Sequence, residues 1–540
     1  MLKSTIKRSI PKASTEQGDL CFTADELEVL RLTNGEYKRS ADGKLVVDFT
    51  GQFGQVRLAV PASVDSKQCV GMTIQMENES QWILVSQFGE GFIEYPASDA
   101  SEAHVIAINA LEELDEHGVQ LPEMGDVYGI GIMCLHEVSA EKPYTIEIES
   151  ITFHMLSEDK GNVPKQIAPD VTEDMTLLNT YGTVLKHVGV FSTLPELQNP
   201  AALQELKKQY NSVTTGNISC FDGLIGGEVS FISIEEAKKL GYVIPKNYNE
   251  SVVPKLNFET LDEVLKICKE NDLGFRFLAL MGPQETNGWF FRVDYKETGN
   301  YVSPEVMDAR LEMYIRTVME HVYGGKYGSV VYAWDVNNEY FHRDPEKSNF
   351  VKVYGQQGLQ PADLKLAYET AEDVLRKYGI RDKVSLVFNE YDTYLMKDGR
   401  NMTEDIIDVL AYINSDSKVC DTIGMQTHLD TDIPIDRQKN AILAFLDAGY
   451  EVQFTEANVY IKIPETGKED QEQYYCELMN NILEIVGAGG KIEGITFGAT
   501  GDIYSWLPQY DPLLFRRPGQ PKDIYYKVLQ LYLDAGFKVK

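Results

Sequence analysis

Long apolar segments, paired cysteines and an excess of positive charge are all missing from this 540-residue sequence. Without a run of about 18 apolar residues, a membrane-spanning helix is excluded. The seven cysteines are widely spaced and form no CxxC pair, which argues against a zinc ribbon or a disulfide scaffold. A formal net charge of −33 repels nucleic acid and anionic lipid, so neither is expected as a partner.

Two further absences narrow the class of function. The sequence has no metal-ligand cluster and no glycine-rich phosphate loop, so we expect neither a metal nor a cofactor. Residues 1–8 are basic but lack the apolar segment of a signal peptide. Either the protein is cytoplasmic, or it is extracellular and its export signal is not part of this sequence; both stay open.

The N-terminal part has the pattern of an all-β sandwich. Short segments rich in Val, Ile and aromatics alternate with Gly, Asp, Asn and Pro, which is typical of strands and turns. We predict a sandwich domain over residues 1–158 and a linker over 159–179. The predicted strands are residues 44–49, 55–60, 72–76, 82–86, 104–109, 128–134 and 144–153.

From residue 180 to 540 the pattern changes to alternating strands and amphipathic helices. Eight such units predict a closed (β/α)8 TIM barrel. An open, doubly wound sheet is the alternative, but no phosphate-binding fingerprint follows the first strand. Residues 224–254 show little periodicity, and we expect a long loop there, over the C-terminal face of the barrel. The predicted strands are residues 184–191, 211–215, 275–280, 330–337, 384–388, 422–428, 451–455 and 494–497.

Two glutamates occupy the positions where barrels carry their chemistry, the C-terminal ends of strands. Glu339 follows the fourth predicted strand and Glu456 follows the seventh. These strands lie on opposite sides of the barrel mouth, so the two carboxyl groups can face each other across a bound chain. Hydrolysis of a glycosidic bond needs such a pair, one protonated and one ionised. The alternative is that each is an ordinary surface charge at a strand end.

Five motifs make the sequence resemble glycoside hydrolase family 10, and they follow the family's order over residues 180–535. Residues 334–339 (WDVNNE) resemble its acid/base signature WDVVNE, and residues 454–456 (FTE) resemble its nucleophile strand. The other three are residues 424–429 (GMQTHL), similar to GxQxHL, residues 387–391 (VFNEY), similar to the NDY element, and residues 512–515 with 521–522, similar to PLLF…PK.

The resemblance implies a role for each matching residue. Glu339 would be the acid/base and Glu456 the nucleophile of a retaining enzyme, with their carboxyl groups about 5–5.5 Å apart. Asn338 would hydrogen-bond the 2-hydroxyl of the sugar. His428, aided by Gln426, would hold the nucleophile carboxylate; the alternative is a barrel histidine whose hydrogen bonds are merely structural.

Two more residues are implied to bind substrate. Trp506 would stack on a sugar face, although plain core packing is the alternative. Asn217 matches a substrate-binding position in the segment that aligns with NSVTPENEMKWD.

The same alignment shows departures around the proposed sugar site. Cys220 replaces a substrate-contacting lysine, Leu278 and Pro283 replace histidines, and Gly282 and Gly498 replace tryptophans; Gly216 also stands where the family has a glutamate. These changes imply a wider and less polar pocket. Such a pocket would admit a substituted xylan or a sugar with a C6 group, or would turn over plain xylan slowly.

The sequence therefore predicts a retaining, endo-acting hydrolase of xylan or a related β-1,4-linked plant polysaccharide. A glycan-binding protein that has lost the chemistry is the alternative, since several substrate contacts are missing. The N-terminal sandwich resembles a carbohydrate-binding module in general layout only. Trp82, Phe92 and Tyr95 are its candidate stacking residues, and filling the sandwich core is the alternative for them.

Overall fold

The structure is a computed structural model, and its chain divides into two compact units. One comprises Met1–Asn162, Leu194–Leu206 and Thr500–Lys522; the other comprises Val163–Thr193, Lys207–Ala499 and Asp523–Lys540. The structure describes residues 19–51, 54–59, 61, 63–64, 69–77, 83–88, 91–96, 103–106, 129–134, 138–139, 141–155, 163–216, 218–225, 229–282, 286–397, 399–460, 468–506 and 510–540.

The N-terminal strands form two antiparallel sheets, which confirms the predicted sandwich. One sheet has the order β3-β4-β11-β6-β9 with β1 added to β11, and the other has the order β2-β5-β10-β7-β8. Their bounds are β1 Leu20–Thr23, β2 Val29–Thr33, β3 Gly35–Arg39, β4 Leu45–Phe49, β5 Gln55–Ala59, β6 Cys69–Glu77, β7 Ile83–Phe88, β8 Gly91–Pro96, β9 Ala103–Ile106, β10 Gly129–Met133 and β11 Tyr144–Met155.

Alternating apolar residues of these strands build the sandwich core. Leu45, Val47 and Phe49 of β4 are buried together with Ile146 and Ile148 of β11. Four strands, β1, β2, β3 and β8, were not among those predicted from the sequence. For β3 the reason is physical: its residues GEYKR are polar and mostly exposed at a sheet edge, so no apolar alternation marks it.

The second unit contains the closed barrel that the sequence predicted. Eight parallel strands follow one another in chain order, and β24 pairs with β12 to close the ring. They are β12 His187–Phe191, β13 Ser212–Thr214, β16 Gly274–Met281, β17 Val331–Asn338, β18 Ser385–Glu390, β21 Thr422–Met425, β23 Glu451–Tyr460 and β24 Ile492–Phe497; a short strand, β22 (His428–Asp430), also pairs with β23.

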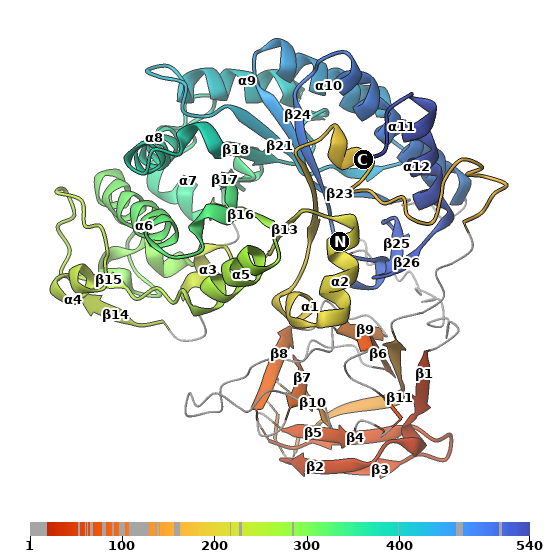
Figure 1. The fold of residues 1–540 in the computed structure, drawn as a ribbon. Coiled ribbons are helices and arrows are strands. Elements are labelled where there is room, and N and C mark those ends of the chain that lie inside the picture. Colours follow the sequence, from red (N-terminus) through yellow and green to blue (C-terminus); the bar gives the residue numbers. More distant parts are fainter. Residues whose placement is uncertain are drawn as a thin grey trace. The chain divides into compact units, whose positions relative to one another are not determined.

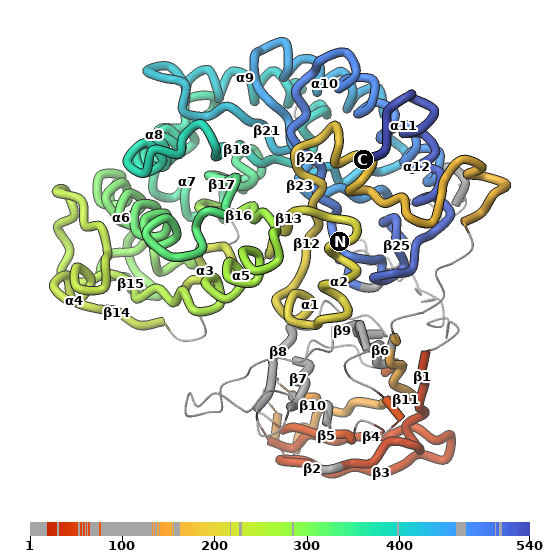
Figure 2. Tube along the Cα trace, in the orientation of Figure 1, coloured from red at the N-terminus to blue at the C-terminus, as the bar shows by residue number. Residues whose placement is uncertain are grey.

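Helices surround these strands (Figure 1), and the colour changes steadily round the ring, so units adjacent in the sequence are neighbours in space (Figure 2). Among the described residues, no helix is both long and apolar enough to cross a bilayer. The helices are α1 Leu194–Gln198, α2 Pro200–Gln209, α3 Phe221–Ile225, α4 Ile234–Lys239, α5 Glu259–Glu270, α6 Pro304–Gly324, α7 Asn349–Tyr354, α8 Ala362–Lys377, α9 Met402–Ile413, α10 Ile435–Asp447, α11 Lys468–Gly487 and α12 Asp523–Asp534.

Helical spacing explains how these helices pack. On α5 the residues Leu261, Val264, Leu265 and Cys268 recur every three or four positions, and all four are buried. The cysteine is therefore a small apolar core residue.

Two regions of the second unit are more ordered than the sequence suggested. Residues 224–254, where we expected only a loop, contain β14 (Phe231–Ser233), α4 and β15 (Val252–Pro254). Elements of three to six residues are too short to show a period, which is why the sequence did not reveal them. At the start of the unit, where a linker was expected, Ala168 and Val171 are fully buried.

Candidate active site

Glu339 and Glu456 both lie at the C-terminal end of the barrel. Glu339 directly follows β17, and Glu456 lies within β23, which continues to Tyr460. The pairing of β23 with β24 shifts register between Phe454 and Ala457. Such an irregularity re-aims the side chains around it. Both glutamates are partly exposed, and 18% of the Glu456 side chain is accessible.

Asn389, at the end of β18, connects the surroundings of the two glutamates. Its amide nitrogen donates to Oδ1 of Asn338 at 3.0 Å and to Oε1 of Glu456 at 3.4 Å, while its oxygen accepts from Thr455 Oγ1 at 2.7 Å. Gly424 permits this arrangement, because a Cβ there would lie 2.6 Å from the Asn389 oxygen. The two carboxyl groups therefore belong to one hydrogen-bond network.

Neutral amides surround the Glu339 carboxyl group. Asn338 Nδ2 and Gln426 Nε2 donate to its Oε1 at 3.3 and 3.2 Å. We had expected Gln426 to assist His428 at the nucleophile, but its amide serves Glu339 and Asn338. The reason is the backbone of Thr427, whose φ of 63° separates the directions of the side chains on either side.

His428 contacts the other carboxylate. Its Nε2 lies 3.4 Å from Oε2 of Glu456, and Asn458 Nδ2 lies 3.0 Å from its Nδ1. Burial raises the pKa of Glu456, but the hydrogen bond and charge of His428, the charge of Arg276 and the Asn389 hydrogen bond outweigh burial and lower it. Burial lowers the pKa of His428, and its interactions with Glu456 outweigh this and raise it. An ionised Glu456 is therefore favoured.

A buried ion pair lies near this site. Arg276 of β16 and Asp335 of β17 are both fully buried and hydrogen-bonded to each other, and Arg276 Nη2 donates to Thr455 O at 2.7 Å. Burial raises the pKa of Asp335 to about 7 despite the arginine. The guanidinium thus ties β16, β17 and β23 together close to Glu456.

The structure brings together Glu339, Glu456, Asn338, Gln426 and His428, five of the residues chosen from the sequence. Asn217 and Pro283 lie outside the described residues. The Trp506 side chain is 61% exposed, which argues against core packing.

At the departures from the family pattern, Cys220 and Leu278 are buried, and a Cβ at Gly498 would lie 2.9 Å from Asn458 Nδ2. A tryptophan at position 498 would therefore require the Asn458 amide to move. No group of three or more His, Cys, Asp or Glu side chains within the described part of the chain is arranged to hold a metal ion.

Asn389, Arg276, Asp335 and Asn458 complete the site, although we did not select them from the sequence. Asn389 follows the pattern that identified the glutamates, a polar residue near the end of a barrel strand, so that signal could have revealed it. The buried pair of Arg276 and Asp335 gives no such signal, because its partners are 59 residues apart.

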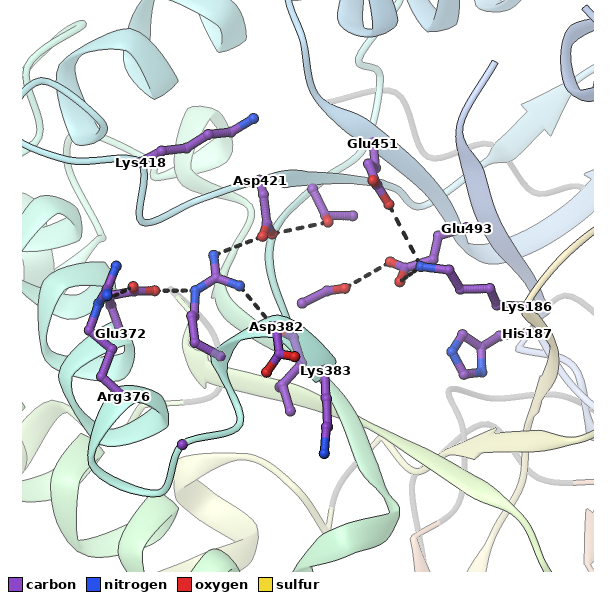
Figure 3. A pocket seen from close by; sticks show the side chains of 15 residues that line it. Lys186, His187, Glu372, Arg376, Asp382, Lys383, Lys418, Asp421, Glu451 and Glu493 are labelled. Atoms are coloured by element: carbon purple, nitrogen blue, oxygen red, sulfur yellow. Dashed lines mark hydrogen bonds and ion pairs between the residues drawn. The ribbon is translucent and has the colours of Figure 1, made fainter. Parts of the chain in front are cut away.

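The opposite end of the barrel holds a polar pocket of about 750 Å³ (Figure 3). Its lining includes residues at or just before the starts of strands, such as Lys186, Asp421, Glu451 and Glu493. Lys186 Nζ lies 3.1 Å from Glu493 Oε1, and Arg381 pairs with Glu372 and Asp421. Barrel active sites lie at the C-terminal ends of strands, so we assign this pocket to the structural end.

Comparison with known proteins agrees with this geometry. The profile of glycosyl hydrolase family 10 matches residues 177–531, more than half of the chain. Endo-1,4-beta-xylanase A of Butyrivibrio fibrisolvens is 37% identical over 386 residues, covering 71% of this chain and 89% of the relative. The bifunctional endo-1,4-beta-xylanase XylA of Ruminococcus flavefaciens is 27% identical, covering 60% of this chain and 31% of the relative.

Solved structures show the same fold. The CBM22-1–GH10 modules of Clostridium thermocellum xylanase 10B, complexed with xylohexaose, match with a TM-score of 0.55 and 18% identity, covering 94% of this chain and 95% of the other. The intracellular xylanase of Thermoanaerobacterium saccharolyticum, with xylotriose, matches with a TM-score of 0.52 and 21% identity, covering 65% and 98%. With its barrel, its paired carboxylates and the family match over residues 177–531, the chain belongs to glycosyl hydrolase family 10.

Proposed function

We propose that this glycoside hydrolase cleaves internal β-1,4 linkages of xylan by double displacement. Glu456 attacks the anomeric carbon and forms a glycosyl-enzyme, while Glu339 protonates the leaving oxygen and then deprotonates the attacking water. One observation carries the proposal. Glu339 and Glu456, both partly exposed, belong to one hydrogen-bond network through Asn338 and Asn389, in which the groups around Glu456 favour its ionised form.

The contacts support this division of roles. His428 and Arg276 stabilise the negative charge of Glu456, which a nucleophile needs. Asn338 and Gln426 both donate to Oε1 of Glu339, and these neutral amides orient the carboxyl group without adding a positive charge beside it. The separation of about 5–5.5 Å expected for a retaining pair stays a prediction.

The names of the relatives support xylan as the substrate, since both relatives compared above are named endo-1,4-beta-xylanases. The apolar residues Cys220 and Leu278 and the small Gly498 stand where the family places polar or aromatic groups, and this supports a substrate with side groups. We expect faster release of reducing ends from glucuronoxylan or arabinoxylan than from undecorated xylan. Equal rates on decorated and plain chains would remove the reason for the wider-pocket proposal.

For the N-terminal sandwich we propose carbohydrate binding, because the structural neighbour described above combines a CBM22 module with a GH10 module. The division into residues 1–158, 159–179 and 180–540 stays our proposal. Phe92 and Tyr95 lie on β8, whereas Trp82 lies outside the described residues. Retention of the chain on insoluble xylan, lost after Phe92→Ala or Tyr95→Ala, would support a binding surface there.

The deciding experiment is product analysis on glucuronoxylan, arabinoxylan, mixed-linkage glucan and cellulose. Release of reducing ends by the wild type, abolished in Glu456→Ala, is the expected result. Binding of xylan without release, in wild type and variant alike, would instead identify a glycan-binding protein.

A further inference from the structure

Glu390, the last residue of β18, is a fully buried carboxylate next to the proposed acid/base. Its Oε2 accepts from the backbone N–H of Phe341 at 2.9 Å. Its Oε1 lies 2.7 Å from His342 Nδ1 and accepts from the Tyr391 N–H at 3.1 Å. Three groups thus converge on one side chain, and two of them belong to the segment that directly follows Glu339.

That segment holds Glu339 in an uncommon conformation. Glu339 has φ 56° and ψ 47°, the left-handed region, and the 3-10 helix Tyr340–His342 begins immediately after it. A non-glycine residue stays in this region only where its surroundings enforce it. On one side, the Glu339 N–H donates to Asn389 O at 3.0 Å. On the other side, the contacts of Glu390 fix Phe341 and His342.

His342 reinforces the attachment. Only 10% of its side chain is exposed, and its ring stacks on Tyr391 with centroids 3.4 Å apart and an interplanar angle of 17°. The histidine is therefore held from two directions, by a carboxylate through Nδ1 and by an aromatic face. Both anchors come from the end of β18, the strand that also supplies Asn389 to the Glu456 side of the network.

We propose that Glu390, together with His342, is a positioning pair that aims the Glu339 carboxyl group at the leaving oxygen. This rests on the proposed role of Glu339. In the first step a Glu456 oxygen bonds to the anomeric carbon and the bond from that carbon to the leaving oxygen breaks. The electron pair stays on the leaving oxygen, which takes the proton of Glu339. A displaced Glu339 slows this step in proportion to the leaving group's need for that proton.

Leaving-group dependence separates positioning from a merely structural role. Phenyl β-xylobioside needs a proton on its departing oxygen, whereas dinitrophenyl β-xylobioside departs as a stable phenolate, so kcat/KM should be compared on both. In Glu390→Gln the new NH2 group must face a backbone N–H, of Phe341 or of Tyr391, and neither can accept it. We expect kcat/KM to fall about ten- to hundredfold on the phenyl substrate and to stay within about twofold on the other.

Glu493→Gln is the matched control. Glu493 is also a buried strand carboxylate with several donors, Gln453 Nε2 at 2.6 Å, Ser385 Oγ at 2.8 Å and Lys186 Nζ at 3.1 Å, but it lies at the other end of the barrel. Its variant should change both substrates equally. His342→Asn is a second test if Glu390→Gln does not fold, and it should show the same selective loss.

The variant Glu339→Ala distinguishes a failure of this inference from a failure of the proposed function. Its kcat/KM should fall far more on the phenyl substrate than on the dinitrophenyl substrate. If it shows no such difference, the role of Glu339 itself is wrong. If Glu339→Ala shows the difference but Glu390→Gln and His342→Asn lower both substrates equally, or lower neither, the positioning role is overturned.

Discussion

At the starts of its strands the barrel pairs carboxylates with cations, whereas at their C-terminal ends amide side chains contact both proposed catalytic carboxyl groups, Glu339 and Glu456. At the first end, Glu493 forms an ion pair with Lys186, and Glu372 forms ion pairs with Arg376, at 2.6 Å, and with Arg381. Figure 3 shows how these ion pairs line the pocket there. Their charges are matched within the protein, so they contribute to holding the barrel closed.

At the C-terminal ends of the strands, neutral amides orient Glu339, whereas Glu456 contacts an amide and a histidine. Glu339 receives the amides of Asn338 and Gln426, and Glu456 receives Asn389 together with the titratable His428. An amide donates a hydrogen bond but carries no charge, so it fixes a carboxyl group without forcing it to ionise. The comparison shows that carboxylates at the two ends of the barrel differ in function because their partners differ.

The largest expected effect concerns β23, which carries Glu451 at its start and Glu456 at the C-terminal end of the barrel. Glu456→Ala should lower kcat/KM on xylan by at least about 10⁴-fold, because the variant lacks the proposed nucleophile. Glu451 lies at the start of the same strand, where its carboxylate forms an ion pair with Lys491 at 3.0 Å, far from the proposed catalytic groups. Glu451→Ala should therefore leave kcat/KM nearly unchanged. Comparable losses in both variants would break the comparison.

A histidine at each end gives the next prediction. The ion pair of His428 and Glu456 exists between the lowered pKa of Glu456 and the raised pKa of His428. In His428→Asn burial then dominates and the pKa of Glu456 rises, so the acidic limb of the pH profile of kcat/KM should move up by about one to three units.

His187→Asn is the control for that shift. His187 lies at the start of β12, at the end of the barrel away from Glu456; burial lowers its pKa to about 4, and its ring stacks on Tyr332. We expect an unchanged acidic limb for this variant. An acidic limb that stays in place in His428→Asn as well would show that His428 does not set the charge of Glu456.

Removing a cation at the starts of the strands should lower the stability of the protein. Arg381→Met leaves Glu372, whose side chain is 5% exposed, without one of its two arginines, and it also removes the ion pair of Asp421 with Arg381. We expect the free energy of unfolding to fall by about 2–4 kcal/mol in denaturant titration, with kcat/KM at 25 °C unchanged in the folded enzyme. A selective loss of activity with normal stability would contradict the division between the two ends.

The smallest effect concerns packing under the site. In Gly424→Ala the new Cβ would press on Asn389 Oδ1 and on Val387, so we expect a loss of about 1–2 kcal/mol in stability and a measurable fall in kcat/KM. Gly487→Ala is the control, because a Cβ there would meet only Phe537 at an ordinary 3.6 Å. Equal thermal shifts in the two variants would show that Asn389 is not tightly packed.

Much of this architecture could be predicted from the sequence. Most barrel strands are largely buried and contain several Val, Ile, Leu or Phe residues, and both glutamates were recognised because they stand near strand ends. The two-stranded sheet of β14 and β15, with α4 between its strands, and the edge strand β3 could not be recognised. Strands β14 and β15 are three residues long and β3 is polar, so none of them carries a periodic signal.

The sequence by itself determined the order of strands and helices and the types of chemical group at the strand ends, because these follow from short-range patterns of polar and apolar residues. Only the tertiary structure decided which groups meet. The left-handed Thr427 directed Gln426 to Glu339, and the irregular pairing of β23 with β24 set the surroundings of Glu456. The pairing of β17 with β18 placed Glu390 beside the segment that follows Glu339. Such contacts join residues dozens of positions apart, and they depend on register and burial, which no local pattern encodes.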